Sequence, residues 1–197
     1  MIRPNIRFAL SFVRRPLCSF TCMFASMPAM QPSESTTTAS TTASTPPWHA
    51  AYPTPENAQP EGVMREEVLA MLNKAGLMDQ HNAKAQDFIL VDLRRTDHEG
   101  GTIRGSVNLP AQSLYPTIPT LYFILKAAGV RKVIWYCSSS RGRGTRAAGW
   151  FADYLSNQGD GDMESLVLVE GIKGWATAGP EYTVWMDGYE KSMWCEN

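Results

Sequence analysis

Cys137 and Arg143 are the two residues whose types and spacing most clearly suggest chemistry. They enclose five residues of Ser, Arg and Gly in the run "CSSSRGR", which is a C-x5-R pattern. A cysteine thiolate is a strong nucleophile, and an arginine can hold two oxygens of a tetrahedral anion in a bidentate grip. A positive environment also lowers the pKa of a thiol, which favours the thiolate. The pattern therefore predicts a nucleophile placed inside an anion-binding loop.

The residues between the cysteine and the arginine suit such a loop. Glycine permits a tight backbone, and serines are small and carry hydroxyl donors. Successive backbone amides in a short loop can converge on one anion, and a helix that begins there adds its positive end. The expected oxyanion-binding residues are Ser138, Ser139, Ser140, Arg141 and Gly142, with Arg146 as a secondary anion contact.

The distribution of charge supports a small anionic ligand. The formal net charge of the 197 residues is −1, which argues against a nucleic-acid binder, because such proteins are usually strongly basic. Between Gly100 and Ala152, however, there is no Asp or Glu. The same stretch contains seven basic residues: Arg104, Lys126, Arg131, Lys132, Arg141, Arg143 and Arg146. We expect a small oxyanion or a phosphorylated substrate as partner, no nucleic acid and no membrane; the oligomeric state is unknown.

Alternating apolar runs and helical patterns predict an α/β fold, with a mostly parallel central sheet and helices on both faces. Strands are expected at 87–93, 132–136 and 165–170, and helices from about 63 to 76, at 118–129 and from about 142 to 156. In such a sheet, ligands bind where a strand ends and the next helix begins. Cys137 stands at such a junction.

Three regions are expected along the chain. Residues 1–30 interleave arginines with apolar residues and contain no acid, as a mitochondrial presequence does. Alternatively translation begins later, at Met23, Met27 or Met30, and the protein is cytoplasmic or nuclear. Residues 31–47 are rich in Ser, Thr and Pro and are expected to form a disordered linker. The folded domain is expected to occupy 48–197.

Two further motifs make the folded part resemble a known family. "VDLRRTDHEGGTIRGSVNLP" at 91–110 resembles the signature of the rhodanese superfamily, and "LVEGIKGWATAG" at 168–179 resembles its closing segment. Together with the cysteine between them, the resemblance spans about residues 60–180. Sulfurtransferases of this superfamily have a loop one residue shorter. The C-x5-R loop is similar to that of the branch of cell-cycle-phosphatase-like and yeast-type arsenate-reductase-like proteins, which includes fungal small phosphatase-like proteins.

This resemblance implies a cysteine-dependent phosphatase or arsenate reductase with a covalent intermediate on Cys137 and with Arg143 as the oxyanion clamp. A phosphatase would need no cofactor, whereas an arsenate reductase would use glutathione and glutaredoxin as external reductant. Two alternatives stay open: a thiosulfate-type sulfurtransferase that carries a persulfide on Cys137, and a non-catalytic anion- or phosphopeptide-binding module. No Cys and His spacing suggests a metal site.

Several charged residues near these motifs are expected to have structural roles. Asp92, Arg94 and Arg104 are expected to form a buried pairing that fixes the loop after the strand, because isolated buried charges are costly. The three residues at 97–99 are expected to form a solvated turn, from which a general acid could come.

Overall fold

The computed structural model describes residues 46–76 and 86–195. The expected presequence and almost all of the expected linker lie outside these ranges. The elements are β1 (Gly62–Val63), α1 (Arg65–Ala75), β2 (Phe88–Asp92), β3 (Thr102–Ile103), β4 (Val107–Asn108), α2 (Ala111–Leu114), α3 (Ile118–Ala127), β5 (Lys132–Tyr136), α4 (Arg143–Gln158), β6 (Glu164–Leu168), α5 (Gly171–Ala176), α6 (Pro180–Thr183) and β7 (Met186–Asp187). Three short 3-10 helices lie at Trp48–Ala51, Tyr115–Thr117 and Lys191–Met193. Within the described ranges, no helix is both long and apolar enough to span a bilayer.

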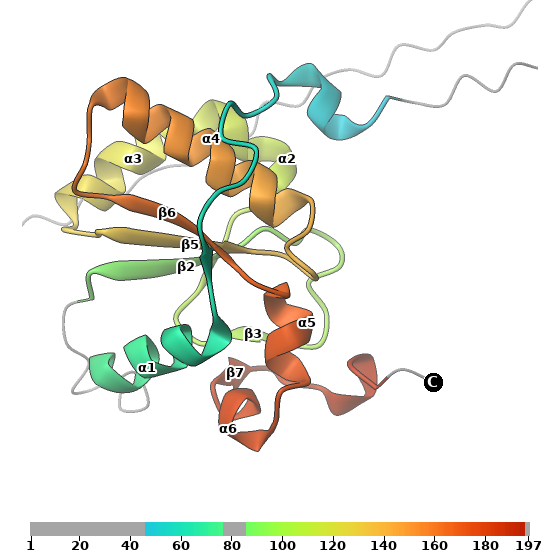
Figure 1. Ribbon diagram of the computed structural model, residues 1–197. Coiled ribbons are helices and arrows are strands. Elements are labelled where there is room, and N and C mark those ends of the chain that lie inside the picture. The colour runs from blue at the N-terminus through green and yellow to red at the C-terminus, as the bar shows by residue number, and fades with distance from the viewer. Residues whose placement is uncertain (1–45, 77–85, 196–197) are drawn as a thin grey trace, which may run out of the picture. The chain divides into compact units, whose positions relative to one another are not determined.

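The main sheet is parallel throughout. Five strands pair in the order β1-β6-β5-β2-β4, and every neighbouring pair is parallel. The remaining two strands, β3 and β7, form a separate antiparallel pair. Helices cover both faces of the main sheet, with α2, α3 and α4 on one face and α1 on the other (Figure 1). The predicted α/β class is therefore confirmed.

The long elements lie where the sequence patterns predict them. The three expected strands are β2, β5 and β6, the three expected helices are α1, α3 and α4, and all their bounds agree within two residues. The two-residue strands were not predicted, because two residues are too few to show a period. The edge strand β1 lies beside β6, and β4 lies beside β2, so these short strands complete the sheet.

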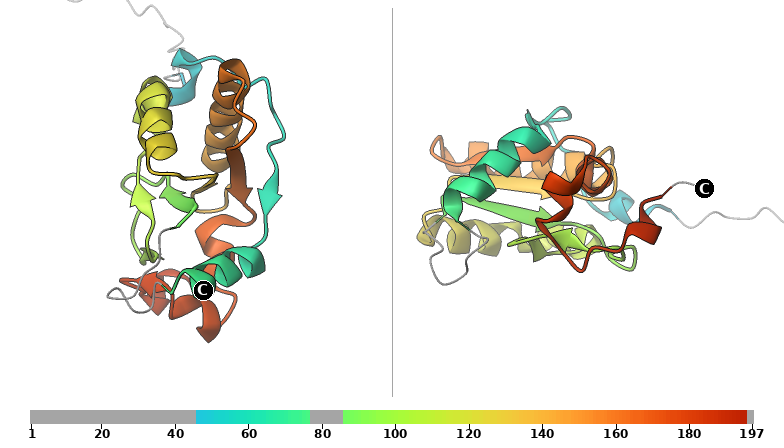
Figure 2. Two further views of the ribbon diagram at one scale, coloured as in Figure 1. Left: turned by 90° about the vertical axis from the view of Figure 1, so that its left-hand side faces the viewer. Right: turned by 90° about the horizontal axis from the view of Figure 1, so that it is seen from below.

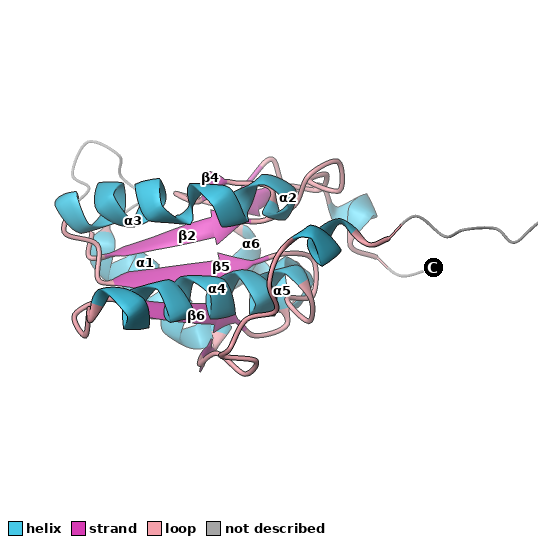
Figure 3. Ribbon diagram, turned by 90° about the horizontal axis from the view of Figure 1, so that it is seen from above, coloured by secondary structure: helices cyan, strands magenta, loops and turns pink. Residues whose placement is uncertain are grey.

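Alternation along β5 decides which face of the sheet receives the cysteine. Successive side chains of a strand point to opposite faces. Ile134 and Tyr136 belong to the core cluster that includes residues of α1, α5 and α6. Val133, Trp135 and then Cys137 belong to the cluster that includes residues of α2, α3 and α4. Figure 2 shows these two layers of helices on opposite sides of the sheet, and Figure 3 views the sheet from the α3 and α4 side.

Helix α4 forms because its apolar residues lie on one side and its end is capped by glycine. Ala147, Ala148, Phe151 and Leu155 are buried at helical spacing against the sheet. Gly159 follows in the left-handed conformation, with φ of 64°, which terminates the helix at low cost. The start of this helix is thereby held at the carboxyl end of β5.

Candidate active site

Cys137 lies at the floor of a cavity at the carboxyl end of the sheet. The cysteine follows the last residue of β5, and α4 begins six residues later. Its side chain is 3% exposed, yet it lines a cavity of about 410 Å³. The other lining residues are Trp48, Gln112, Ser138, Ser139, Gly142, Arg143 and Arg146. Among the described residues, no Asp, Glu or His contributes to this lining.

The backbone carbonyls of the loop are directed at neighbouring elements. The Cys137 carbonyl accepts a hydrogen bond from the Ile172 amide at 3.0 Å, and the Ser138 carbonyl accepts one from the Lys173 amide at 2.9 Å. Both donors belong to α5. Two further carbonyls accept bonds from α4: Ser140 from the Thr145 amide and Gly142 from the Arg146 amide. The loop therefore turns its acceptors outward, toward the helices that flank it.

Unlike its carbonyls, the backbone amides of the loop form no hydrogen bonds with neighbouring elements of the described chain. Over the described parts of the chain, the amides of residues 138–143 donate to no protein acceptor. Ser138, Ser140 and Arg143 are buried or half-buried, so their amides need an acceptor, which here is solvent or a ligand, whereas residues 139, 141 and 142 are exposed. Six consecutive unused donors beside a thiol are what a tetrahedral oxyanion requires.

Three small residues let the loop close this tightly. Ser140 adopts a left-handed backbone with φ of 57° and is buried, and its hydroxyl accepts a hydrogen bond from the Cys137 amide at 3.4 Å. A Cβ atom at Gly144 would lie 2.9 Å from the Cβ of Ser140. At Gly171 it would lie 2.3 Å from the Cys137 carbonyl oxygen. Glycine at both positions is therefore required by the close approach of α4 and α5 to the loop.

Arg143 lies over the loop but is paired with a carboxylate. Its Nη2 donates to the Ser138 hydroxyl at 3.3 Å. Its Nη1 donates to Oδ1 of Asp97 at 2.9 Å, and its Nη2 forms a second, very short contact with Oδ2 of the same carboxylate. The hydrogen bonds from Arg143 hold the pKa of Asp97 well below its usual range, against the opposing effect of burial. The same bonds raise the pKa of Arg143, and the Cys137 thiolate contributes to that shift.

Asp97 is therefore a support for Arg143 in this structure. A carboxyl group whose pKa lies far below 7 is ionised at neutral pH, and Asp97 is so while it is paired with Arg143. The Ser138 hydroxyl donates to Oδ2 of Asp97 at 3.1 Å, so the carboxylate connects the loop to the helix start. The expected solvated turn at 97–99 thus contains a site contact that was not predicted.

Arg146 supplies a second cation to the cavity. It lies one turn after Arg143 on α4 and lines the cavity. Over the described ranges, its guanidinium forms no hydrogen bond or ion pair with the protein. An unpaired guanidinium beside unused amides makes the cavity electropositive, which favours an anion.

The predicted buried pairing forms between two of its three expected members. The Arg94 guanidinium donates from Nη2 to Oδ2 of Asp92 at 2.7 Å, with side chains 1% and 0% exposed. Arg94 also donates to the carbonyls of Glu99 and Gly101, so the pair fixes the loop that follows β2. Placing Arg104 in this pairing was wrong, because its Nε donates to the Asp187 carboxylate at 2.8 Å.

The structure gathers most of the predicted site residues and adds three. Cys137, Ser138, Ser139, Gly142, Arg143 and Arg146 line one cavity. Ser140 is buried next to the cavity, and Arg141 is exposed and does not line it. The added residues are Trp48, Gln112 and Asp97. Over 46–76 and 86–195, no group of three His, Cys, Asp or Glu side chains is placed to hold a metal ion.

Comparison with known proteins shows that this chain is similar to a known family. The family model described as "Rhodanese-like domain" matches residues 66–178. Arsenical-resistance protein 2 of Saccharomyces cerevisiae is 31% identical over 99 residues, which are 47% of this chain and 76% of that protein. A structure of Ygr203w, described as a yeast protein tyrosine phosphatase of the rhodanese family, has a TM-score of 0.56 and 22% identity over 68% of this chain and 96% of that chain.

A second structure of Ygr203w from Saccharomyces cerevisiae is described as a homologue of single-domain rhodanese and of the Cdc25 phosphatase catalytic domain. It has a TM-score of 0.54 and 21% identity, over 68% of this chain and 91% of that chain. At this level of identity the likeness establishes a shared fold.

Proposed function

Because the chain belongs to the rhodanese-like domain family, we propose that it is a phosphatase that uses Cys137 as nucleophile. The observation that carries the proposal is the set of six loop amides, residues 138–143, that directly follow the Cys137 thiol and have no acceptor in the described protein. Arg143 and Arg146 add positive charge at the same cavity. Such a site matches a group with several charged oxygens better than it matches a single sulfur atom.

In the proposed reaction, the Cys137 thiolate attacks the phosphorus of a phosphate monoester. An S–P bond forms, the P–O bond to the leaving group breaks, and the ester oxygen leaves with the bonding electron pair. The loop amides and Arg143 stabilise the charge on the equatorial oxygens. Water then attacks the cysteinyl phosphate, the S–P bond breaks, and inorganic phosphate and the thiolate are released.

The leaving oxygen takes its proton from solvent in this scheme. Asp97 is the carboxylate bonded to the loop, and Arg143 keeps it ionised. Among the described residues, no Asp or Glu, Asp97 included, lines the cavity. Esters of acidic alcohols, whose oxygen leaves readily as an anion, are therefore better substrates than alkyl esters.

Arsenate reduction is the second candidate, and it is favoured by the 31% identity to Arsenical-resistance protein 2. The thiolate would attack arsenic(V) and displace hydroxide. A glutathione thiol would then attack Sγ, the S–As bonding pair would stay on arsenic, and arsenite would leave. The resulting disulfide between Cys137 and glutathione would be reduced by glutaredoxin, which accounts for both electrons.

A panel of three assays on the purified full chain separates these activities. The substrates are p-nitrophenyl phosphate, arsenate with glutathione and glutaredoxin, and thiosulfate with cyanide, with Cys137→Ser as the inactive control. The proposal expects the aryl phosphate to have the highest kcat/KM. A higher kcat/KM for arsenate would make the second candidate the function. Faster turnover of thiosulfate would establish a sulfurtransferase, and phosphate binding without any turnover would establish a binding module.

A further inference from the structure

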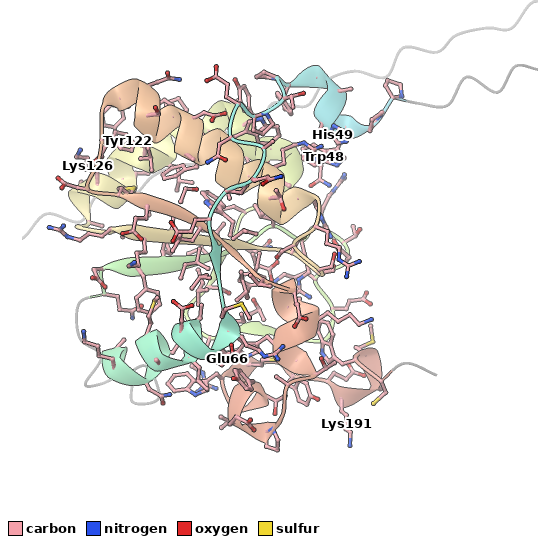
Figure 4. The ribbon with its side chains drawn as sticks, viewed as in Figure 1. Trp48, His49, Glu66, Tyr122, Lys126 and Lys191 are labelled. Carbon is pink, nitrogen blue, oxygen red and sulfur yellow. The ribbon has the colours of Figure 1, made fainter. Side chains whose placement is uncertain are left out.

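Trp48 lines the Cys137 cavity although it lies outside the part of the chain that matches the family. The family model begins at residue 66, whereas Trp48 is on the first 3-10 helix. It is half-buried, and it is the aromatic member of the cavity lining. Figure 4 shows the side chains of Trp48 and His49 beside α4. This segment therefore adds an apolar, planar surface to a cavity that is otherwise polar.

The Trp48 ring is held by contacts with other aromatic rings. Its centroid lies 6.3 Å from that of Trp150 on α4 and 5.5 Å from that of His49, both in edge-to-face geometry. Edge-to-face contacts of this kind are favourable and fix the orientation of a ring. The Trp48 ring is therefore already oriented before a ligand binds, which reduces the conformational entropy lost on binding.

The residues that follow Trp48 are attached to α4 at several points. The Trp150 indole donates to the Pro53 carbonyl at 2.8 Å. The Asp153 carboxylate accepts from the backbone amides of Glu56 and Asn57 at 2.8 and 3.0 Å. A Cβ atom at Gly149 would lie 2.5 Å from the Asn57 carbonyl, so glycine permits this close approach. We call residues 46–58 the N-terminal strap.

Gln112 lines the cavity and carries a side-chain oxygen that has no hydrogen-bond partner in the described part of the chain. Its Oε1 is buried and has no hydrogen-bond partner among the described residues. Gln112 belongs to α2, which the strap contacts, because the Tyr52 hydroxyl donates to the Gln112 carbonyl at 3.3 Å. A buried polar atom without a partner is unfavourable, so an enclosed water is the expected partner of this oxygen.

We propose that the cavity is built for an aryl phosphate, with the aromatic ring of the substrate against Trp48 and its phosphate in the Cys137 loop. This inference rests on the proposed function and names its substrate class. The lack of an acid in the described cavity lining agrees with it, because an aryl oxide leaves without a proton donor more readily than an alkoxide does. A phosphotyrosine side chain supplies both the ring and the phosphate.

The test measures binding to the full chain carrying Cys137→Ser, which keeps the loop but cannot turn over. Phenyl phosphate and cyclohexyl phosphate present rings of the same number of carbons, one aromatic and one aliphatic. We expect phenyl phosphate to bind about two- to tenfold more tightly, the size of an aromatic pair contact. Trp48→Ala should abolish this difference and leave the Kd of inorganic phosphate unchanged within about twofold.

Two further variants keep the result interpretable. Trp48→Phe retains an aromatic ring and should preserve most of the preference even if the alanine variant loosens the strap. Phe123→Ala removes an exposed aromatic side chain from α3 that does not line the cavity, and it should have no effect. Melting temperatures of all variants would show whether the strap has detached.

The outcomes separate the inference from the proposed function. If inorganic phosphate binds but phenyl phosphate has no advantage, or keeps its advantage in Trp48→Ala, the aromatic wall is wrong and the phosphatase proposal stands. If inorganic phosphate does not bind the loop, both are wrong.

Discussion

Two groups compete for the Arg143 guanidinium: the Asp97 carboxylate of the same chain and the proposed anionic ligand. In the structure its guanidinium is held by both oxygens of Asp97 and by the Ser138 hydroxyl. An oxyanion in the loop competes with Asp97 for the same donors and is repelled by its negative charge. Asp97 therefore holds the clamp in position at some cost to anion affinity.

Replacing Asp97 by asparagine should reveal this competition. The variant keeps the shape of the side chain and removes its charge, so inorganic phosphate should bind about two- to tenfold more tightly at pH 7. Isothermal titration of phosphate into both proteins would measure the change. Weaker binding in Asp97→Asn would mean that positioning Arg143 matters more than the charge that Asp97 adds.

The stability of this pair should depend on pH in a defined direction. The folded-state pKa of Asp97 lies below its ordinary value of 3.8 because of Arg143. The pair therefore contributes stability above pH 3.8, and this contribution is lost as the pH falls from 3.8 toward the folded-state value. The difference in melting temperature between wild type and Asp97→Asn should accordingly shrink between about pH 7 and about pH 2.5. A difference that grows on acidification would contradict the assignment.

The nucleophile and the clamp should respond differently to substitution. Cys137→Ser should reduce turnover of p-nitrophenyl phosphate by about a thousandfold or more, because a serine hydroxyl is a poor nucleophile without a base. Arg143→Lys replaces the two-pronged guanidinium by a point charge and should lower kcat/KM about ten- to a hundredfold. Steady-state kinetics would check both. Wild-type kcat/KM in the lysine variant would show that Arg143 does not hold the transferred group.

The shape of the loop depends on α5 as much as on the loop residues. Two amides of this six-residue helix donate to the carbonyls of Cys137 and Ser138, whereas the loop amides donate to no acceptor in the described protein. Gly171, at the start of α5, has φ of 60° and lies against the Cys137 carbonyl. The loop is therefore shaped by two residues of α5 that each lie 35 positions after the carbonyl that they bind.

Alanine at Gly171 should disturb this arrangement much more than alanine at a matched glycine. Gly159 has a similar φ of 64°, but no atom lies within 4 Å of the place that its Cβ would take, so Gly159→Ala adds backbone strain alone, about 1 kcal/mol. Gly171→Ala adds a clash with the Cys137 carbonyl and should cost about 3 kcal/mol or more. Thermal unfolding would compare the two. Equal losses would show that α5 can move away from the loop without penalty.

Sequence patterns predicted the elements that carry the site better than they predicted its contacts. The strand-to-helix junction at Cys137 follows from the apolar run of β5 and the small residues after it, because both are local signals. The pairing of Asp97 with Arg143 joins residues 46 positions apart, and no local pattern indicates it. Trp48 was missed for a related reason: Pro-rich residues with no period precede β1, and their packing depends on Trp150 and Asp153 in α4. Arg104 was misassigned because charge alone does not identify which carboxylate lies nearby.

At the scale of the whole molecule, the N-terminal strap should mark the functional boundary of the domain. A chain lacking residues 1–45 should keep the melting temperature and activity of the full chain. Removing residues 1–58 also removes the aromatic contacts of Trp48 and Tyr52 with Trp150, at a cost of about 2 kcal/mol, or about 4–8 °C in melting temperature. Calorimetry of the two truncated proteins would measure this. An equal melting temperature in both would mean that the strap does not stabilise the domain.

The position of the strap has a consequence for how such a protein diversifies. The nucleophile and its anion loop lie within residues 66–178, the span shared with the family, whereas Trp48 belongs to a short stretch before it. In the proposed arrangement, the catalytic loop and the aromatic contact with the substrate are thus encoded in separate stretches of sequence. Exchanging the strap alone should be enough to retune which esters the protein accepts. The same exchange offers protein engineers a way to build a set of enzymes with one catalytic core and many preferences.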